Sequence, residues 1–349
     1  MSLEETETAV GAASGLREWD GLPAGLLERE AAELADVLGG PALLHIPGRK
    51  GPPVFVSVLL HGNETTGWEA VRTVLRRYAD RVLPRAVSLF VGNVAAAREG
   101  ARYLPGQSDF NRIWGGGEAP EARMAEEVLD RLAEQGVFAG VDIHNNSGRN
   151  PHYACVNRLD HRFLHLATLF SRTVVYFRRP ETTLSNNLAE LCPAVTVECG
   201  EPGRPDGVAH AAELLEAVLH LGELPATRLP PQDYDLFHTV ARVTLPPGVT
   251  ADFSRGDLLL RGDLDHLNFV ELPPGTGFGQ VRAGVERASQ VLEARSEDGE
   301  EVADRYFWID GPELRTRQRV MPAMLSRDPV IIRQDCLCYL MERLPPVEG

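Results

Sequence analysis

Short apolar segments alternate with amphipathic segments from about residue 40 to residue 222, and no other feature restricts the possible folds as strongly. Six apolar segments are typical of buried strands: Ala42–Ile46, Val54–Leu60, Ala86–Val91, Val137–Ile143, Thr173–Phe177 and Ala194–Val197. Apolar residues at helical spacing predict helices over 68–78, from Pro120 onward, and over 207–222. Strands that alternate with such helices predict an α/β fold, in which helices cover both faces of a sheet.

The pattern changes near Leu224-Pro225, where pairs of prolines replace the long helical periods. Short strand-like runs follow at Thr239–Leu245, Leu258–Leu260, Gln290–Ala294, Tyr306–Ile309 and Pro329–Ile332. We therefore predict two domains. Residues 1–226 carry the α/β sheet, and residues 227–349 form a smaller, β-rich C-terminal domain.

The formal net charge of the 349-residue chain is −15 at pH 7, which argues against nucleic acid or an anionic membrane as a partner. Binding either requires an excess of Lys and Arg. No apolar run approaches the ~20 residues that span a bilayer, and residues 1–19 lack the basic-then-apolar pattern of a signal peptide. Five cysteines without the spacing of a disulfide framework predict a reducing, cytoplasmic location.

Four groups that can bind a metal or move a proton stand where three predicted strands end. His61 follows the second strand, with Glu64 three residues later. His144 follows the fourth strand, and Glu198 follows the sixth. Ligands of open α/β sheets collect at the carboxyl ends of strands. If the three strands are neighbours, all four side chains face one crevice.

Two histidines and one carboxylate, with one coordination position left open, make up a typical catalytic zinc site. Zinc lowers the pKa of a bound water from 15.7 to about 7, which produces a nucleophile near neutral pH. Glu198 would then be the unliganded carboxylate that takes the water's proton and passes it to the leaving nitrogen. A structural histidine explains His61 or His144 taken alone, but the combined pattern favours a metal.

A polar segment between these groups, residues 107–112, predicts a carboxylate-binding site. Asn111 beside Arg112 suits this purpose, because the guanidinium offers a planar pair of donors and the amide adds another. Asp109 could accept a hydrogen bond from the outer nitrogen of a metal-bound imidazole. A polar loop held by local turns is an equal alternative for this segment.

Four ordered motifs resemble the succinylglutamate desuccinylase/aspartoacylase family, a branch of the zinc carboxypeptidase superfamily. They are His61-Gly62-Asn63-Glu64, Asp109-Phe110-Asn111-Arg112, Asp142-Ile143-His144-Asn145 and Glu198-Cys199-Gly200. The resemblance covers roughly residues 40–222. It implies that residues 1–226 form a zinc-carboxypeptidase-like catalytic domain, a mixed sheet flanked by helices. A β-rich C-terminal domain in this family narrows the active-site entrance.

The resemblance implies one Zn²⁺ per chain, bound by His61, Glu64 and His144. It also implies that Glu198 is the general base and acid. The predicted function is therefore a zinc-dependent hydrolase, a deacylase that cleaves the amide bond of a small N-acyl amino acid.

Further residues acquire roles from the same resemblance. Asn111 and Arg112 stand where the family binds the α-carboxylate of the substrate, and Asp109 stands where it supports a metal-binding histidine. An upstream arginine of the family polarises the scissile carbonyl. Arg102 matches it best, and Arg98 is the weaker candidate.

One departure from the family concerns a second substrate carboxylate. Aspartoacylases resemble this chain around Thr182-Thr183, but they then carry an arginine that binds that carboxylate, where this chain has Leu184. A buried carboxylate facing leucine would lack its charge partner, which argues against N-acetylaspartate as the substrate. Arg178 and Arg179 are near enough in sequence to substitute.

Three other groups carry weaker signals. The polar loop 145–153 either lines the pocket, through Arg149, His152 or Tyr153, or forms a surface turn. The pair His161 and His165 has the spacing of metal ligands on a helix, but surface or packing roles are favoured. The Cys336-Leu337-Cys338 segment lacks a partner pair for a metal, and buried thiols on one strand face are favoured.

Two other functions remain open at this point. A zinc carboxypeptidase would use the same chemistry on the C-termini of peptides, in an open groove. A non-catalytic, metal-binding regulatory protein would keep the ligands without turnover. Nucleotide binding is disfavoured, because neither G-x-G-x-x-G after the first strand nor a P-loop is present. The sequence leaves a homo-oligomer open.

Overall fold

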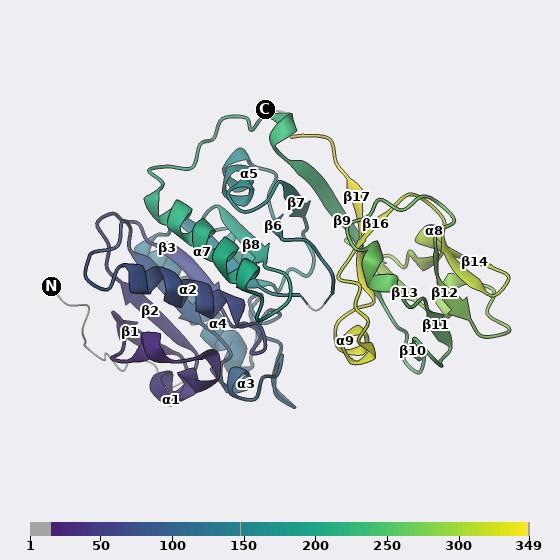
Figure 1. Cartoon of the computed structure of the whole chain (residues 1–349), viewed down its shortest axis with the longest axis horizontal. Helices are drawn as coiled ribbons and strands as arrows, with labels where there is room; N and C mark the ends of the chain where they lie inside the picture. Colours follow the sequence, from purple (N-terminus) through teal and green to yellow (C-terminus); the bar gives the residue numbers. More distant parts are fainter. Residues whose placement is uncertain (1–14, 147, 348–349) are drawn as a thin grey trace.

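A mixed sheet of twelve strands runs through the protein in the computed structural model, which describes residues 15–146 and 148–347 (Figure 1). Its strands follow the order β1-β2-β4-β3-β5-β8-β6-β7-β9-β17-β16, and β13 pairs with β9. They are β1 (Arg17–Asp20), β2 (Ala42–Ile46), β3 (Val54–Val58), β4 (Val87–Val91), β5 (Ala139–His144), β6 (Tyr153–Val156), β7 (Thr173–Tyr176), β8 (Ala194–Glu198), β9 (Asp235–Thr244), β13 (Glu293–Ser296), β16 (Met321–Ala323) and β17 (Cys338–Arg343). The six predicted strands are therefore present, with bounds shifted by at most two residues.

The centre of this sheet is parallel. Strand β3 pairs in parallel with β5, and β5 pairs in parallel with β8. Every residue of β3 and β5 is buried, as expected for central strands covered on both faces. Because β3, β5 and β8 are neighbours and run the same way, their carboxyl ends meet at one edge of the sheet. The register places His144 directly opposite Glu198.

Helices cover both faces of the parallel part. They are α1 (Leu34–Leu38), α2 (Thr66–Arg77), α3 (Val94–Arg98), α4 (Pro120–Gln135), α5 (His161–Thr168), α6 (Leu184–Leu188) and α7 (Pro205–His220). Figure 1 shows α2 and α7 side by side on one face. Helix α2 contacts Ile143 of β5 through Gly67, whereas Leu188 of α6 packs on Gly140 of β5. Ile143 and Gly140 point to opposite sides of the strand, so α2 and α6 lie on opposite faces of the sheet.

The C-terminal region is rich in β-structure. A second sheet has the order β10-β11-β12-β15-β14. Its strands are β10 (Ala251–Asp252), β11 (Leu258–Leu260), β12 (Gly277–Val281), β14 (Phe307–Asp310) and β15 (Glu313–Thr316), and the short helix α8 (Ala303–Tyr306) lies beside them. Phe278 and Phe307 are buried in the core of this region. These features confirm the predicted fold class, an α/β sheet flanked by helices with a smaller β-rich region.

Strand β9 links the two regions, because it pairs with β7 on one side and with β17 on the other. The large sheet therefore continues beyond residue 226. The division into domains at that residue stays a prediction.

The predicted strand Pro329–Ile332 is wrong, because these residues open helix α9 (Pro329–Gln334). The side chain of Asp328 accepts a hydrogen bond from the backbone N–H of Val330 at 2.8 Å, which caps the helix. Pro329 occupies the first helical position, where its missing N–H costs nothing. This local capping outweighs the β-preference of the three branched residues that follow the proline.

The structure also bears on the predictions about membrane spans and cysteines. Among the described residues, no helix is long and apolar enough to cross a bilayer. Residues 1–14, on which most of the signal-peptide argument depends, lie outside the described part of the chain. All five cysteines are buried and unpaired, as predicted for Cys336 and Cys338. The two do not share a strand face, however, because β17 begins at Cys338 and Cys336 precedes it.

Candidate active site

The end of strand β3 is shaped by close backbone contacts. Leu59 adopts a positive φ of 57°, and its carbonyl accepts a hydrogen bond of 2.6 Å from the N–H of Asn93. Such a conformation is costly for leucine and persists only when its surroundings hold it. Three residues later, a Cβ on Gly62 would lie 2.2 Å from the backbone nitrogen of Ala97, so only glycine fits there. The chain therefore turns sharply and directs His61 into the crevice.

The three strand ends are tied to one another. The N–H of Asn145 donates to Glu64 Oε2 at 3.0 Å, and its side chain donates to the carbonyl of Gly200 at 2.8 Å. The N–H of Cys199 donates to the carbonyl of His144 at 2.9 Å. These bonds connect the ends of β3, β5 and β8 into one rigid rim.

His61, Glu64 and His144 converge within this rim. Glu64 Oε1 lies 2.8 Å from His61 Nδ1, and Glu64 Oε2 lies 2.8 Å from His144 Nδ1. The two imidazole centroids are 5.2 Å apart, and one donor atom from each of the three residues lies within 4.8 Å of the others. All three side chains are buried. The predicted metal ligands are thus brought together.

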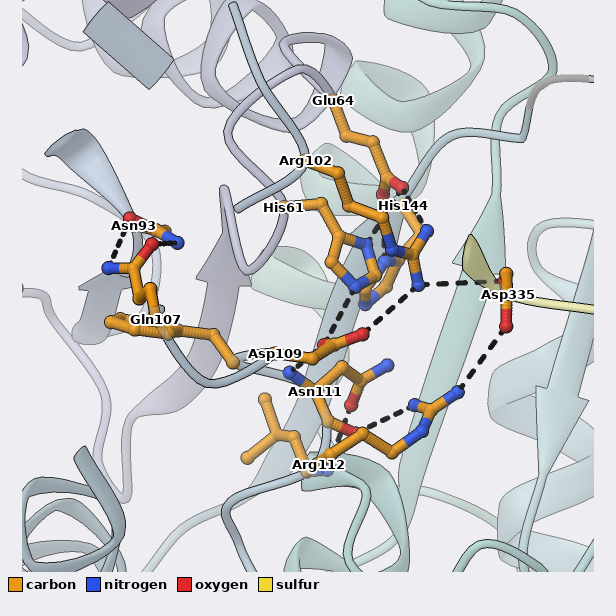
Figure 2. A network of polar contacts seen from close by, with 12 residues as sticks. His61, Glu64, Asn93, Arg102, Gln107, Asp109, Asn111, Arg112, His144 and Asp335 are labelled. Atoms are coloured by element: carbon orange, nitrogen blue, oxygen red, sulfur yellow. Dashed lines mark hydrogen bonds and ion pairs between the residues drawn. The ribbon is translucent and has the colours of Figure 1, made fainter. Parts of the chain in front are cut away.

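Each of the two imidazoles has a carboxylate beside its Nε2 nitrogen. His61 Nε2 lies 3.1 Å from Asp109 Oδ1 (Figure 2). His144 Nε2 lies 3.0 Å from Asp142 Oδ2. A carboxylate on the outer nitrogen fixes the tautomer of a metal-binding histidine and directs the other nitrogen at the metal. Two imidazole nitrogens and one carboxylate are a donor set that suits zinc. The residues present therefore fit the metal that the sequence resemblance implies.

The charges of this cluster depend on one another. Burial by itself would raise the pKa of Glu64, but His61 and His144 outweigh burial and hold that pKa well below its usual value. Burial by itself would lower the pKa of His144, but Asp142 and Glu64 raise it well above the usual value. Burial by itself would also raise the pKa of Asp109, but His61 and Arg102 outweigh burial and hold that pKa well below its usual value. The carboxylates therefore stay ionised and available to a cation.

Glu198 lies at the edge of this cluster. It lines the same pocket as His61 and His144, and its Oε2 accepts a hydrogen bond of 3.4 Å from the side chain of Asn146. Burial raises the pKa of Glu198 to about 8, and the nearby Glu64 adds to that shift, although His144 opposes it. A carboxyl group with a pKa near neutrality can both take up and release a proton at physiological pH.

This raised pKa predicts how stability depends on pH. Because Glu198 binds its proton more tightly in the folded state, the stability linked to it is lost as pH rises from about 4.5 to about 8. In chelator-treated protein, Glu198→Gln should therefore become more stable relative to wild type over this range. The gain should reach a few kcal/mol, since one pKa unit is worth about 1.4 kcal/mol. Denaturant unfolding at several pH values measures it.

The matched control is Glu201→Gln, because Glu201 is an exposed glutamate in the same segment. Its stability relative to wild type should not change with pH. A Glu198→Gln difference that is equally flat would contradict the assignment of a raised pKa to Glu198.

Arg102 and Arg112 lie beside the cluster of metal ligands (Figure 2). Arg102 Nη1 lies 3.7 Å from Glu64 Oε1, and Arg102 Nη2 lies 3.4 Å from Asp109 Oδ2. Asp335, which follows α9, lies 3.6 Å from Arg102 Nη2 and 4.0 Å from Arg112 Nη2. Asn111 Oδ1 accepts a hydrogen bond of 3.1 Å from the N–H of Leu184. The predicted substrate-binding residues thus surround the metal cluster, together with a carboxylate from the C-terminal region.

A pocket with an empty volume of about 800 Å³ contains these groups. The metal ligands and Glu198 lie at its edge with Arg102, and Asn111 and Arg112 also line it. Tyr339 and Met341 of β17 line it as well, so the C-terminal region forms part of its wall.

Other residues singled out in the sequence lie elsewhere. Arg98 forms an ion pair with the exposed Asp36 rather than entering the pocket. From the loop after His144, Tyr153 lines the pocket, whereas Arg149 contacts His266 and His152 stacks on His210. His165 Nε2 bonds the carbonyl of Thr227 at 2.9 Å, and the side chain of His161 accepts from the N–H of Leu229. The histidines of α5 thus have backbone partners.

Three residues were connected above with a possible second carboxylate of the substrate: Leu184, Arg178 and Arg179. Leu184 is fully buried in the core. Arg178 forms an ion pair of 2.8 Å with Glu297. Arg179 lines the pocket, but its Nη1 lies 2.7 Å from Glu181. Both arginines therefore already have acidic partners.

Sequence reasoning missed two acidic residues of this site. Asp142 could have been found, because it precedes His144 by two residues and therefore lies on the same face of a strand. Asp335 had no such signal, since only the pairing of β17 with β9 brings it near Arg102.

Sequence comparisons relate the chain to known proteins of one family. The sequence model described as "Succinylglutamate desuccinylase/Aspartoacylase catalytic domain" matches residues 50–221. A succinylglutamate desuccinylase of Burkholderia lata is 36% identical over 132 residues, which cover 36% of this chain and 34% of that protein. One of Serratia proteamaculans is 37% identical over 94 residues, which cover 24% of this chain and 28% of that protein. The chain thus matches about a third of the length of these curated relatives.

Solved structures share the fold over most of the chain. Succinylglutamate desuccinylase from Chromobacterium violaceum superposes with a TM-score of 0.57 at 20% identity, covering 86% of this chain and 87% of that one. Murine aminoacylase 3 superposes with a TM-score of 0.52 at 18% identity, covering 86% of this chain and 100% of that one. The ectoine utilization protein EutE (DoeB) from Ruegeria pomeroyi superposes with a TM-score of 0.56 at 15% identity, covering 86% of this chain and 87% of that one. At these identities the likeness concerns the fold.

Proposed function

Because the chain belongs to the succinylglutamate desuccinylase/aspartoacylase family through its residues 50–221, we propose that it is a zinc-dependent deacylase. It hydrolyses the amide bond of a small N-acyl amino acid. One observation carries this proposal: the donor atoms of His61, Glu64 and His144 meet beside Glu198 in a pocket that also contains Arg112.

His61, Glu64 and His144 would hold the metal, and Asp109 and Asp142 would keep the two imidazoles oriented. When bound, zinc supplies Lewis acidity that polarises a carbonyl oxygen and lowers the pKa of a water molecule to about 7. The carboxylates behind the histidines raise the basicity of the imidazoles and strengthen their hold on a cation.

Glu198 acts as general base and then as general acid. It removes a proton from the attacking water and delivers it to the leaving nitrogen, so that the amine departs neutral. Burial supports this cycle, because it raises the pKa of Glu198 toward neutrality. The hydrogen bond from Asn146 orients the carboxylate.

Arg102 stabilises the negative charge that develops on the substrate oxygen. Its guanidinium is charged at every relevant pH, because Asp335, Glu64 and Asp109 outweigh burial and hold its pKa above the usual value. Ion pairs with Glu64 and Asp109 fix it beside the metal ligands before substrate arrives. A donor held in place in this way costs no reorganisation during the reaction.

Arg112 binds the substrate carboxylate with help from Asn111. Replacing Arg112 by methionine keeps the length of the side chain and removes its charge. We expect KM to rise about 10- to 100-fold, because a hydrogen bond to a charged group is worth about 1.5–3 kcal/mol. Steady-state kinetics with an N-acyl amino acid measures this change.

The matched control for that variant is Arg123→Met, since Arg123 is exposed on α4. It should leave KM unchanged. An Arg112→Met protein with the KM of wild type would contradict the role of Arg112.

A release assay tests the proposal as a whole. N-acetyl and N-succinyl amino acids are offered to the protein with zinc and with a chelator, beside short peptides with free C-termini. Release of the amino acid that needs zinc supports a deacylase, whereas faster trimming of peptides would support the carboxypeptidase alternative. The pocket wall from β17 argues for small substrates, because a peptide needs an open groove. The unpaired state of all five cysteines supports a reducing, cytoplasmic setting.

A further inference from the structure

The sheet carries a row of apolar side chains beyond the metal ligands. Cys155 of β6 pairs in register with Val175 of β7, and Met341 of β17 pairs with Met321 of β16. These four residues belong to a small hydrophobic cluster that is separate from the two main cores. Phe177 and Met324 pack against this cluster and are only partly buried.

Of the six residues just named, five line the active-site pocket. They are Cys155, Val175, Phe177, Met324 and Met341, which we call the apolar wall. The wall shares one cavity with the metal ligands, so a substrate whose amide reaches Glu198 can place another part of its structure on the wall. Pockets of this kind bind ligands mainly by burying apolar surface, while a few polar groups set the orientation.

The arginines of the pocket differ in how many acidic partners they already have. Among the described residues, the arginines that line the pocket are Arg102, Arg112 and Arg179. Arg102 already lies within 4 Å of three carboxylates, and Arg179 lies beside Glu181. Within the described part of the chain, Arg112 has a single acidic contact, Asp335 at 4.0 Å. The pocket therefore offers one arginine to one substrate carboxylate.

A second substrate carboxylate that lay on the apolar wall would have no charge partner there. Removing a carboxylate from water without a charge partner is costly, so the wall disfavours it. An alkyl, thioether or aromatic group gains from the same contact, because it leaves water for an apolar surface.

We propose that the substrate is a monocarboxylate: an N-acyl amino acid whose carboxylate lies on Arg112 and whose apolar group lies on the apolar wall. This inference rests on the proposed deacylase function and narrows its substrate class. The apolar group belongs either to the amino-acid side chain or to the acyl chain, and the same wall accepts both.

The experiment compares substrates on the zinc-loaded wild-type protein. N-acetyl-L-methionine and N-acetyl-L-phenylalanine carry the apolar group on the amino acid, and N-hexanoylglycine carries it on the acyl chain. N-succinyl-L-glutamate and N-acetyl-L-aspartate are the substrates with additional carboxylates, and N-acetylglycine has neither feature. We expect kcat/KM to be highest for one of the apolar arms, and the better arm identifies which part of the substrate meets the wall.

A variant of the wall makes the test specific. Phe177→Ala removes a partly buried ring from the wall and leaves the metal ligands intact. It should lower kcat/KM for the preferred apolar substrate at least about 10-fold, since even one methylene in an apolar pocket is worth 10- to 200-fold. Turnover of N-acetylglycine, which has no apolar group to place on the wall, should fall less than turnover of the preferred apolar substrate. Val82→Ala is the matched control, because Val82 is an apolar residue that is 46% exposed and does not line the pocket.

Each outcome decides between the two proposals. Faster turnover of N-succinyl-L-glutamate or N-acetyl-L-aspartate would overturn the apolar substrate class and leave the deacylase function intact. If no amide is cleaved, the deacylase function fails, and binding is compared by the shift in Tm of Glu198→Gln protein. A larger shift with N-acetyl-L-methionine than with N-acetyl-L-aspartate would still support the apolar wall as a binding surface, whereas the reverse order would overturn it.

Discussion

Replacing Glu198 by glutamine is expected to lower kcat by about 10²- to 10⁴-fold, the contribution typical of a general acid or base. Glutamine has nearly the same shape as glutamate, but it cannot accept a proton from water or return one to the leaving nitrogen. The metal ligands His61, Glu64 and His144 are unchanged in this variant, so zinc content should remain that of wild type. Single-turnover kinetics and elemental analysis of the same sample measure both quantities.

Glu201→Gln is the matched control for this experiment as well. The same chemical change three residues later, on an exposed side chain, should leave kcat within about twofold of wild type. Retention of full activity by zinc-loaded Glu198→Gln protein would remove Glu198 from the mechanism. Loss of zinc from that variant would instead show that Glu198 helps to hold the metal.

Replacing His61 by alanine is expected to abolish zinc binding and, with it, turnover. The substitution removes one of the three convergent donors and leaves Glu64 with a single imidazole partner. It also removes the partner of Asp109, a carboxylate that lies between His61 and Arg102. Elemental analysis after dialysis against a weak chelator measures bound zinc, and a Tm titration with zinc shows whether any binding remains.

The control for this prediction is His165→Ala. His165 belongs to the other histidine pair that the sequence offered as metal ligands, and its ring bonds a backbone carbonyl instead. Its loss should leave one zinc ion per chain. Stoichiometric zinc in His61→Ala protein, or zinc lost from His165→Ala protein, would refute the assignment of the metal centre.

Much of the fold could be predicted from local patterns. The apolar runs of β3 and β5 are long enough to identify central strands without knowledge of their partners. Strand β1 was missed, because its sequence Arg-Glu-Trp-Asp has no apolar run and depends on pairing with β2. The segment Pro329–Ile332 was assigned to the wrong type of element, because a single capping aspartate outweighed its composition.

The candidate site divides along similar lines. His61, His144 and Glu198 stood out because each follows an apolar run directly. The apolar wall did not, since apolar residues in strands are ordinary core residues until the arrangement of strands exposes one row to a pocket. The partner that now occupies Arg178 was equally hidden, because Glu297 lies in the C-terminal region.

The sequence by itself determined which segments become strands and helices and which side chains stand at the strand ends, because both depend on residues adjacent along the chain. Only the tertiary structure decided that β17 lies beside β9, and so that Asp335 meets Arg102 and Met341 meets the pocket. The reason is physical. Pairing between distant strands is chosen by the total burial and hydrogen bonding of the whole sheet, and it leaves no periodic trace in the local sequence.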